Sequence, residues 1–190
     1  MDLQVDHSVV CRAALGLGMF AAVALAQPEI PDAHFVLVQT GIRVAGLTST
    51  ELRQITAEVM RTTFDMPDSW DEELRARRVF WGASEMLVVR GSHLLCGGTG
   101  NCQVWVFARL KNRWVPTFDQ RAPIASGLAF EEDVSKGLNN LILVTNLGGD
   151  KDRYTRYRFD GKFYRADECL DVEPADDLSG DAKVTEVRCE

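Results

Sequence analysis

Histidine is scarce in this sequence of 190 residues: it occurs three times, and only His34 and His93 lie beyond residue 26. No serine stands in a G-x-S-x-G motif, so the sequence offers few candidate residues for a serine–histidine–aspartate triad. Acidic residues cluster at 71–73 and 131–133, a pattern typical of helix starts and solvated turns, and nothing selects one pair as glycosidase-like. We therefore expect a protein that is not an enzyme and needs no cofactor.

A basic surface is missing as well. The formal net charge is −7, from 21 basic and 28 acidic residues. Residues 27–166 hold 18 basic and 17 acidic residues, whereas residues 167–190 hold nine acidic and two basic ones. This balance excludes an overall basic field of the kind that binds nucleic acid. It also marks residues 170–190 as an acidic C-terminal segment.

Long apolar runs are limited to residues 13–26. This run follows Arg12, ends in Ala24-Leu25-Ala26 and is too short to span a bilayer, as is typical of a signal peptide; a buried or membrane-associated helix is the alternative. We expect a signal peptide at 1–26 and a periplasmic or secreted chain at 27–190, with no membrane span after cleavage. The sequence is 46% apolar, which suits one domain with one core.

Cysteine is limited to five residues, and cleavage would remove Cys11. The remaining four are an even set suited to an oxidising compartment, and they allow three pairings. Closeness in sequence favours Cys96–Cys102 and Cys169–Cys189, because each pair closes a local loop rich in turn residues.

The clearest local signal is a helix start. Thr48 and Glu51 form an S/T-x-x-E capping box, and Leu47 and Leu52 occupy the positions of a hydrophobic staple. Apolar residues then recur every three to four positions through about residue 64, which predicts an amphipathic helix.

The rest of the chain indicates strands. Residues 34–40 read as a short strand, while residues 66–82 are ambiguous, since Asp68 or Ser69 could cap a short helix through the acidic and basic residues that follow. Beyond Glu85 the apolar period is two, and strands are predicted at 85–91, 102–110, 113–120, 140–147, 154–160 and 162–168. The fold class is therefore α+β, with an N-terminal amphipathic helix packed on an antiparallel, meander-like, disulfide-stabilised β-sheet.

The glycine-rich loop between Cys96 and Cys102 has four interpretations. A phosphate loop lacks the Lys-Ser/Thr pair of a Walker motif, and a redox pair has two residues between its cysteines rather than five. A zinc site could use His93, Cys96 and Cys102, but the fourth ligand is missing, so no metal is expected. The interpretation that we favour is a disulfide that pins the start of a strand.

The predicted hairpin at 154–168 is the best candidate for a binding surface. A two-residue turn at Asp160-Gly161 would place Arg156 opposite Arg165 and leave one aromatic face for the core. Opposed arginines are unfavourable unless an anion lies between them. That anion is either the acidic segment that begins at residue 167 or an external anionic or glycan ligand. The predicted ligand-binding residues are Tyr154, Arg156, Arg158 and Arg165.

Several motifs together resemble a family of uncharacterised exported bacterial proteins with a β-rich domain. They are C-G-x-x-G-N-C at 96–102, the aromatic strand after it, the return strand at 113–118 and Y-R-F-D-G-K-F-Y-R at 157–165. In that family a D-x-N-G-D-G-like turn, of a type suited to calcium binding, commonly precedes the strand before the cysteine loop. This chain reads R-R-V-F-W-G-A-S-E-M at 77–86, so no calcium site is carried over. The resemblance covers about residues 48–169 and implies a fold rather than an activity.

These observations favour a monomeric, non-catalytic exported domain that binds an envelope protein or an anionic or glycan ligand. One alternative is an inhibitor of an envelope-directed hydrolase such as lysozyme, since such inhibitors are small, disulfide-bridged and β-rich. Another is a hydrolase with an unidentified carboxylate site.

Overall fold

The structure is a computed structural model that describes residues 34–63, 70–81, 84–119, 121–175 and 182–189. The expected signal peptide at 1–26 and the expected caps Asp68 and Ser69 lie outside these residues. Within the described ranges, no helix combines the length and the apolar character that a membrane crossing requires.

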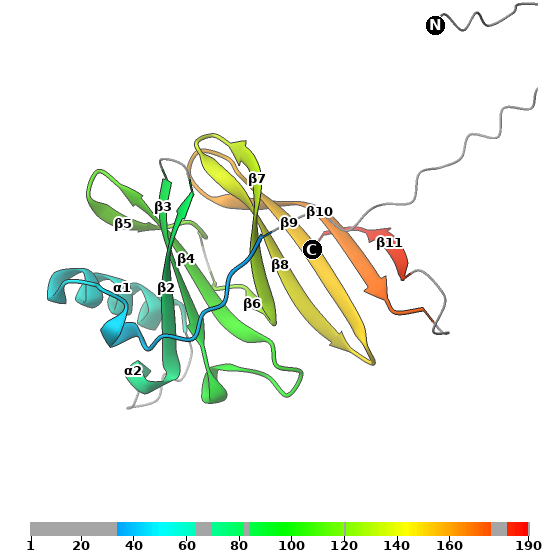
Figure 1. Cartoon of the computed structure of the whole chain (residues 1–190), viewed down its shortest axis with the longest axis horizontal. Coiled ribbons are helices and arrows are strands. Elements are labelled where there is room, and N and C mark those ends of the chain that lie inside the picture. Colours follow the sequence, from blue (N-terminus) through cyan, green and yellow to red (C-terminus); the bar gives the residue numbers. More distant parts are fainter. Residues whose placement is uncertain (1–33, 64–69, 82–83, 120, 176–181, 190) are drawn as a thin grey trace, which may run out of the picture.

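Two antiparallel β-sheets make up most of the described chain (Figure 1). The six-stranded sheet has the order β1 (His34–Phe35), β7 (Gly127–Ser135), β8 (Leu138–Gly148), β9 (Lys151–Phe159), β10 (Tyr164–Glu173) and β11 (Lys183–Val187). The five-stranded sheet has the order β2 (Leu74–Trp81), β3 (Ser84–Gly91), β4 (Cys102–Leu110) and β5 (Arg113–Pro116), with β6 (Ile124–Ala125) also paired to β4.

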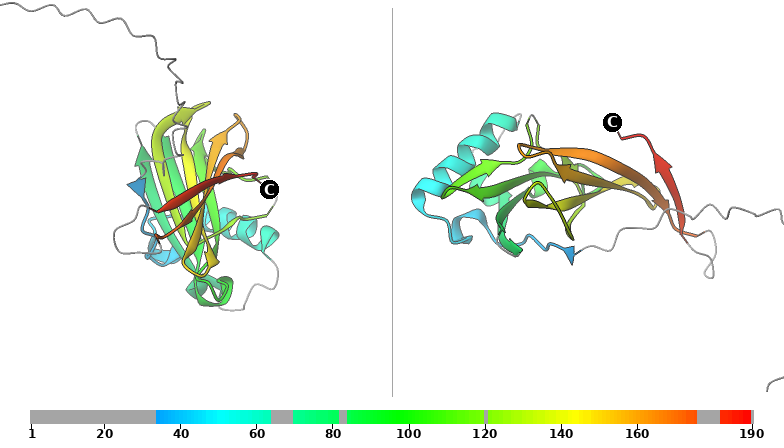
Figure 2. Two further views of the ribbon diagram at one scale, coloured as in Figure 1. Left: turned by 90° about the vertical axis from the view of Figure 1, so that its right-hand side faces the viewer. Right: turned by 90° about the horizontal axis from the view of Figure 1, so that it is seen from above.

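The helical segments are few and short. They are the 3-10 turns η1 (Ile42–Val44) and η2 (His93–Leu95), the helix α1 (Ser49–Thr62) and the helix α2 (Trp70–Glu73). Figure 2 shows α1 at one end of the molecule and β11 at the other, with the two sheets between them.

The main apolar core lies between the two sheets. Met86 and Val106 from the five-stranded sheet belong to the same buried cluster as Phe130, Leu141 and Phe159 from the six-stranded sheet. Burial of side chains from both sheets in one cluster is the packing expected of two β-layers. The inter-sheet cluster therefore joins segments far apart in the sequence.

A second core lies between α1 and the other face of the five-stranded sheet. Ile55 and Val59 of α1 pack with Leu87, Trp105 and Phe107. Because successive residues of a strand point to opposite faces, the odd-numbered positions of β4 serve this core and the even-numbered ones serve the inter-sheet core. The apolar face of the predicted amphipathic helix is thus buried.

The start of α1 confirms the predicted capping box. The backbone N–H of Glu51 donates to the Thr48 hydroxyl at 3.2 Å, and the Glu51 carboxylate accepts from the Thr48 backbone N–H at 2.8 Å. Leu47 and Leu52 both pack against the helix-side core, as the staple predicted.

The expected α+β architecture is confirmed in part. The antiparallel strands, the helix and the two disulfides are present, but the described chain is largely β. Two sheets replace the single meander. The alternation of a strand shows which face is buried and does not show which strand lies against it.

Several boundaries also differ from the sequence prediction. The predicted short helix is limited to α2 at 70–73, and residues 74–81 form β2. Alternate residues of β2 face opposite sides: Leu74 and Ala76 pack towards α1, and Val79 and Trp81 pack towards the inter-sheet core. The strands β7 and β11 were not predicted, and β5 ends at Pro116 instead of residue 120. The turn at Lys111-Asn112 is confirmed, with φ values of 48° and 61°.

Candidate binding site

The turn of the β9–β10 hairpin differs from the predicted two-residue turn. Its loop has four residues, and the Asp160 carboxylate accepts hydrogen bonds from the backbone N–H groups of Lys162 at 2.8 Å and Phe163 at 2.7 Å. Gly161 has φ 102°. The hydrogen bonds from Phe163 and Lys162 and the contact with Arg165 lower the pKa of Asp160 to about 2. The carboxylate of Asp160 therefore organises the loop.

The longer loop changes the register of the hairpin by two residues. Tyr164 lies opposite Phe159, and Arg165 lies opposite Arg158 instead of Arg156. A shift of two keeps each side chain on its predicted face, since the side-chain period is two. Phe159 and Tyr164 are buried in the inter-sheet core, and Tyr157 packs against it, as expected of the aromatic face.

Arg156 is held by two carboxylates. A bulge between Ala166 and Glu168 places Glu168 opposite Arg156, and the Arg156 guanidinium lies 2.6 Å from Glu168 Oε2 and 2.9 Å from Glu131 Oε1. The side chain of Glu131 is almost fully buried, and its second oxygen, Oε2, has no hydrogen-bond partner. Arg156 therefore compensates a buried charge within the sheet.

Arg158 and Arg165 are also paired within the molecule. Arg158 lies 3.0 Å from Asp167, and Arg165 lies 2.6 Å from Asp119 and 3.0 Å from Asp160. The two carboxylates raise the pKa of Arg165. These side chains are more than half exposed, so solvent screens each ion pair and its contribution to stability is small. The opposed arginines are thus balanced without an external anion.

Tyr154, the fourth predicted ligand residue, belongs to a small apolar cluster. It packs against Ala129, Ile142 and Val144 of the same sheet. Burial, and to a smaller extent the charge of Asp152, raises the pKa of Tyr154. The structure therefore places Tyr154 in packing instead of at an open anion site.

The acidic C-terminal segment divides into two parts. Asp167 and Glu168 pair with hairpin arginines, whereas Asp171 lies 2.7 Å from Arg153 and 3.3 Å from Lys151. Leu170–Glu173 is the end of β10 and Lys183–Val187 is β11. The first acidic residues after the hairpin thus neutralise Arg156 and Arg158 from within the molecule, and among the described residues beyond 169 none forms an ion pair with the three hairpin arginines.

Both predicted disulfides are present. Cys96 is bonded to Cys102 and Cys169 to Cys189, with Cα–Cα distances of 3.9 Å and 5.4 Å. The zinc interpretation needed the thiolates of Cys96 and Cys102, and both sulfurs are used in the disulfide. The third candidate ligand, the side chain of His93, lies outside what the structure describes.

The 96–102 loop is attached to the other sheet by one side chain. Asn101 Nδ2 donates to the carbonyl oxygen of Asn146 at 2.7 Å, and the Asn146 backbone N–H donates to Asn101 Oδ1 at 2.8 Å. The same amide donates to the Thr99 hydroxyl at 2.8 Å, and Arg90 donates to the carbonyl oxygen of Gly100 at 3.3 Å. The role of Asn101 was not predicted, although it stands in the C-G-x-x-G-N-C motif.

The clamped loop is followed in the structure by exposed apolar side chains on the neighbouring strands. Residues 97–100 are exposed, and Leu147 next to the Asn146 clamp is exposed as well. Ile124 of β6 is exposed and accepts a hydrogen bond at its carbonyl oxygen from Thr145, 3.2 Å away. The loop therefore has a fixed position next to an apolar surface. We call residues 97–100, Ile124 and Leu147 the loop surface.

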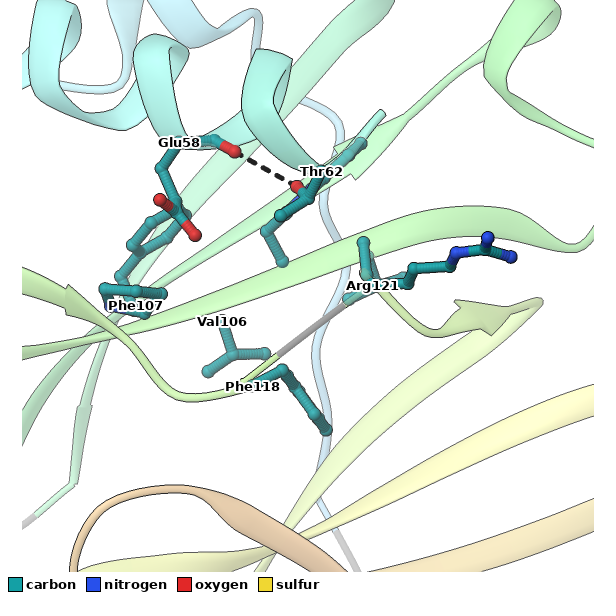
Figure 3. Close-up of a pocket in the computed structure, with 10 residues that line it drawn as sticks. Glu58, Thr62, Val106, Phe107, Phe118 and Arg121 are labelled. Atoms are coloured by element: carbon teal, nitrogen blue, oxygen red, sulfur yellow. Dashed lines mark hydrogen bonds between the residues drawn. The ribbon is translucent and has the colours of Figure 1, made fainter. Parts of the chain in front are cut away.

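The pocket beneath α1 is too small for a ligand. Glu58, Thr62, Phe107, Phe118 and Arg121 are among the residues around it (Figure 3), and its volume of about 10 Å³ accommodates about one water molecule. The Thr62 hydroxyl donates to the carbonyl oxygen of Glu58 at 3.0 Å and accepts from the Trp105 indole at 2.8 Å. The Thr62 hydroxyl therefore already has both a hydrogen-bond acceptor and a donor.

The described carboxyl groups with a displaced pKa are all displaced downward: Glu51, Asp71, Asp160, Asp171 and Glu173. A general acid needs a raised pKa instead. No group of three or more histidine, cysteine, aspartate or glutamate side chains suited to a metal ion occurs in the ranges that the structure describes.

No protein-family model matches the sequence, and comparisons with curated proteins and with solved structures find no match. The resemblance to exported bacterial proteins therefore remains a prediction that depends on the quoted motifs alone.

Proposed function

We propose that this protein is a non-catalytic binding domain of the periplasm or the extracellular space, and that the loop surface contacts its partner. The observation that carries the proposal is the attachment of the 96–102 loop, in which residues 97–100 are exposed, by a disulfide at its base and by the Asn101 clamp to β8. A loop that is already ordered loses little conformational entropy on binding. Two disulfides support an oxidising compartment.

The loop surface also favours a second candidate function, inhibition of an envelope-directed hydrolase such as lysozyme. A short, rigid, glycine-rich loop has room to enter an active-site cleft, since residues 97–100 are exposed and carry no side chain larger than threonine. This candidate differs from the first only in the consequence of binding.

A direct test uses the disulfide-bonded chain with two probes, an animal lysozyme and intact peptidoglycan sacculi. Binding is measured by biolayer interferometry, and lysozyme inhibition by the clearing of sacculi. We expect Gly98→Gln to weaken binding at least tenfold, because it alters the loop surface. Val134→Gln is the matched control at an exposed position of β7, outside the loop surface.

The outcomes separate the candidates. Lysozyme binding with inhibition supports the inhibitor, and binding of either probe without inhibition supports the plain binding domain. If neither probe binds, or if Gly98→Gln and Val134→Gln bind equally well, the assignment of the loop surface is wrong. Release of reducing sugars from sacculi by the protein alone would show an enzyme.

A further inference from the structure

We propose that the outer edge of β2 binds an extended peptide with acidic and apolar side chains as an additional β-strand. This surface is separate from the loop surface, because residues 77–81 form the end of β2 that pairs with the beginning of β3, whereas the loop follows the end of β3. The proposal does not depend on the function proposed above.

The backbone direction of β2 leaves hydrogen-bonding groups at this edge. The N–H of Ala76 donates to the carbonyl oxygen of Thr40 at 2.7 Å, so the backbone of Ala76 points away from β3. Backbone direction alternates along a strand, so the N–H and C=O groups of Arg78 and Phe80 point the same way. No backbone hydrogen bond within the described ranges joins Arg78 or Phe80 to residues 35–40.

Space for a strand exists beside these groups. A groove of about 320 Å³ is lined by Phe35, Val36 and residues 77–81. A neighbouring groove of about 350 Å³ is lined by residues 76–78 and by Leu37, Gln39, Thr40, Val44 and Ala45. Arg77 and Arg78 line both grooves, so the two grooves are adjacent, and we call them together the channel. Each volume lies in the range of ligand sites.

The rim of this channel is unusually apolar for an exposed surface. Phe35, Leu37, Val44 and Phe80 are 63%, 63%, 74% and 68% exposed. They come from the 35–37 segment, from η1 and from β2, and they line the two grooves. Large apolar side chains gathered around an open sheet edge are typical of strand addition, in which backbone groups give affinity and alternate side chains give specificity.

The charge at this edge selects an acidic peptide. Arg75 donates to the carbonyl oxygens of Glu72 and Leu74, and Arg77 donates to the carbonyl oxygen of Leu37 at 3.0 Å. Within the described ranges, neither guanidinium forms an ion pair with a carboxylate, whereas Arg78 between the two grooves is paired with Glu51 and Glu85. A second copy of β2 would set this basic stretch against itself, which like charges oppose, whereas carboxylates would complement it.

The experiment uses a fluorescent ten-residue peptide that alternates valine and glutamate, with a valine–lysine peptide as its counterpart. We expect the full chain to bind the glutamate peptide at least tenfold more tightly in fluorescence anisotropy. Arg77→Glu should remove or reverse this preference. Arg113→Glu makes the same charge change on β5, the opposite edge of the same sheet, and should alter affinity less than twofold.

Hydrogen exchange locates the bound peptide. The amides of Arg78 and Phe80 should gain protection when the glutamate peptide binds, and Phe80→Pro, which removes one outward N–H, should abolish binding while β2 stays paired to β3. Equal binding of both peptides, or no added protection, contradicts the proposal. Protection without peptide also contradicts it: if it rises with protein concentration the occupant is a second copy, and if it does not the occupant is part of the same chain.

Discussion

At the scale of single residues, Glu51 has the most connections. Its carboxylate accepts from the Thr48 backbone N–H at 2.8 Å and from the Trp114 indole at 3.1 Å, forms an ion pair with Arg109, and lies 3.7 Å from Arg78. The hydrogen bonds from Thr48 and Arg109 lower its pKa from 4.5 to about 2. One side chain therefore caps α1 and joins it to β2, β4 and β5.

Glu51→Gln should lower the free energy of unfolding by about 1–3 kcal/mol near neutral pH, through loss of charge-assisted hydrogen bonds and part of the cap. Because the folded pKa is below the unfolded one, the charge stabilises the fold above about pH 4.5, and this stabilisation is lost as the pH falls towards 2. Urea unfolding at several pH values measures both effects.

Glu58→Gln on the same helix is the control, since Glu58 forms an ion pair with the exposed Arg61 three residues away. It should change stability by less than about 0.5 kcal/mol. If the stability difference between the wild type and Glu51→Gln is the same at pH 6 and pH 2.5, Glu51 does not have the assigned role.

At the scale of elements, β2 and the β9–β10 hairpin show how local contacts set the conformation and the register of a strand. The basic residues that suggested the end of a helix lie in the strand β2. A strand conformation there buries Leu74 and Ala76 in the core between α1 and the five-stranded sheet. In the β9–β10 hairpin, the hydrogen bonds of Asp160 close a four-residue loop, and the cross-strand pairs between this loop and the bulge lie two positions from those predicted.

Gly161→Ala should destabilise the protein by about 1–2 kcal/mol, because φ 102° places an L side chain in an unfavourable conformation. Gly98→Ala is the control, since its φ is not positive and an added Cβ meets no atom within 4 Å. Thermal unfolding should show a lower midpoint for Gly161→Ala and little change for Gly98→Ala. Equal midpoints would contradict the loop assignment.

At the scale of the whole molecule, the C-terminal segment is part of the six-stranded sheet. Leu170 is buried and Asp171 is paired with Arg153, whereas β11 is mainly exposed and is tied to β10 by pairing and by the Cys169–Cys189 disulfide. The end of β10 thus belongs to the fold, and β11 is an added edge strand.

A chain that ends at residue 175, with Cys169→Ser to avoid a free thiol, should still unfold cooperatively. A chain that ends at residue 169 with the same substitution loses Leu170, and removal of a large buried side chain costs about 2–5 kcal/mol. Circular dichroism during urea unfolding compares the two. If both chains unfold at the same urea concentration, residues 170–173 do not contribute as described.

The sequence alone determined the features that depend on neighbouring residues. The capping box needs only Thr48 and Glu51, three positions apart, and the Cys96–Cys102 bridge closes over a loop with its own turn residues. The predicted bounds of β3 and β4 agree with the observed bounds to within one residue. The arginines of the hairpin were also found, together with their acidic neighbours Asp167 and Glu168.

Only the tertiary structure decided the features that depend on distant partners. The acidic stretch at 131–133 resembled a turn, yet Glu131 is buried in β7 because Arg156, 25 residues away, compensates its charge. Strand pairing over long sequence separations also decides three other features. They are the division into two sheets, the clamp from Asn101 to Asn146 and the open edge of β2. Side-chain alternation specifies a buried face, but the partner on that face is selected by burial summed over the whole chain.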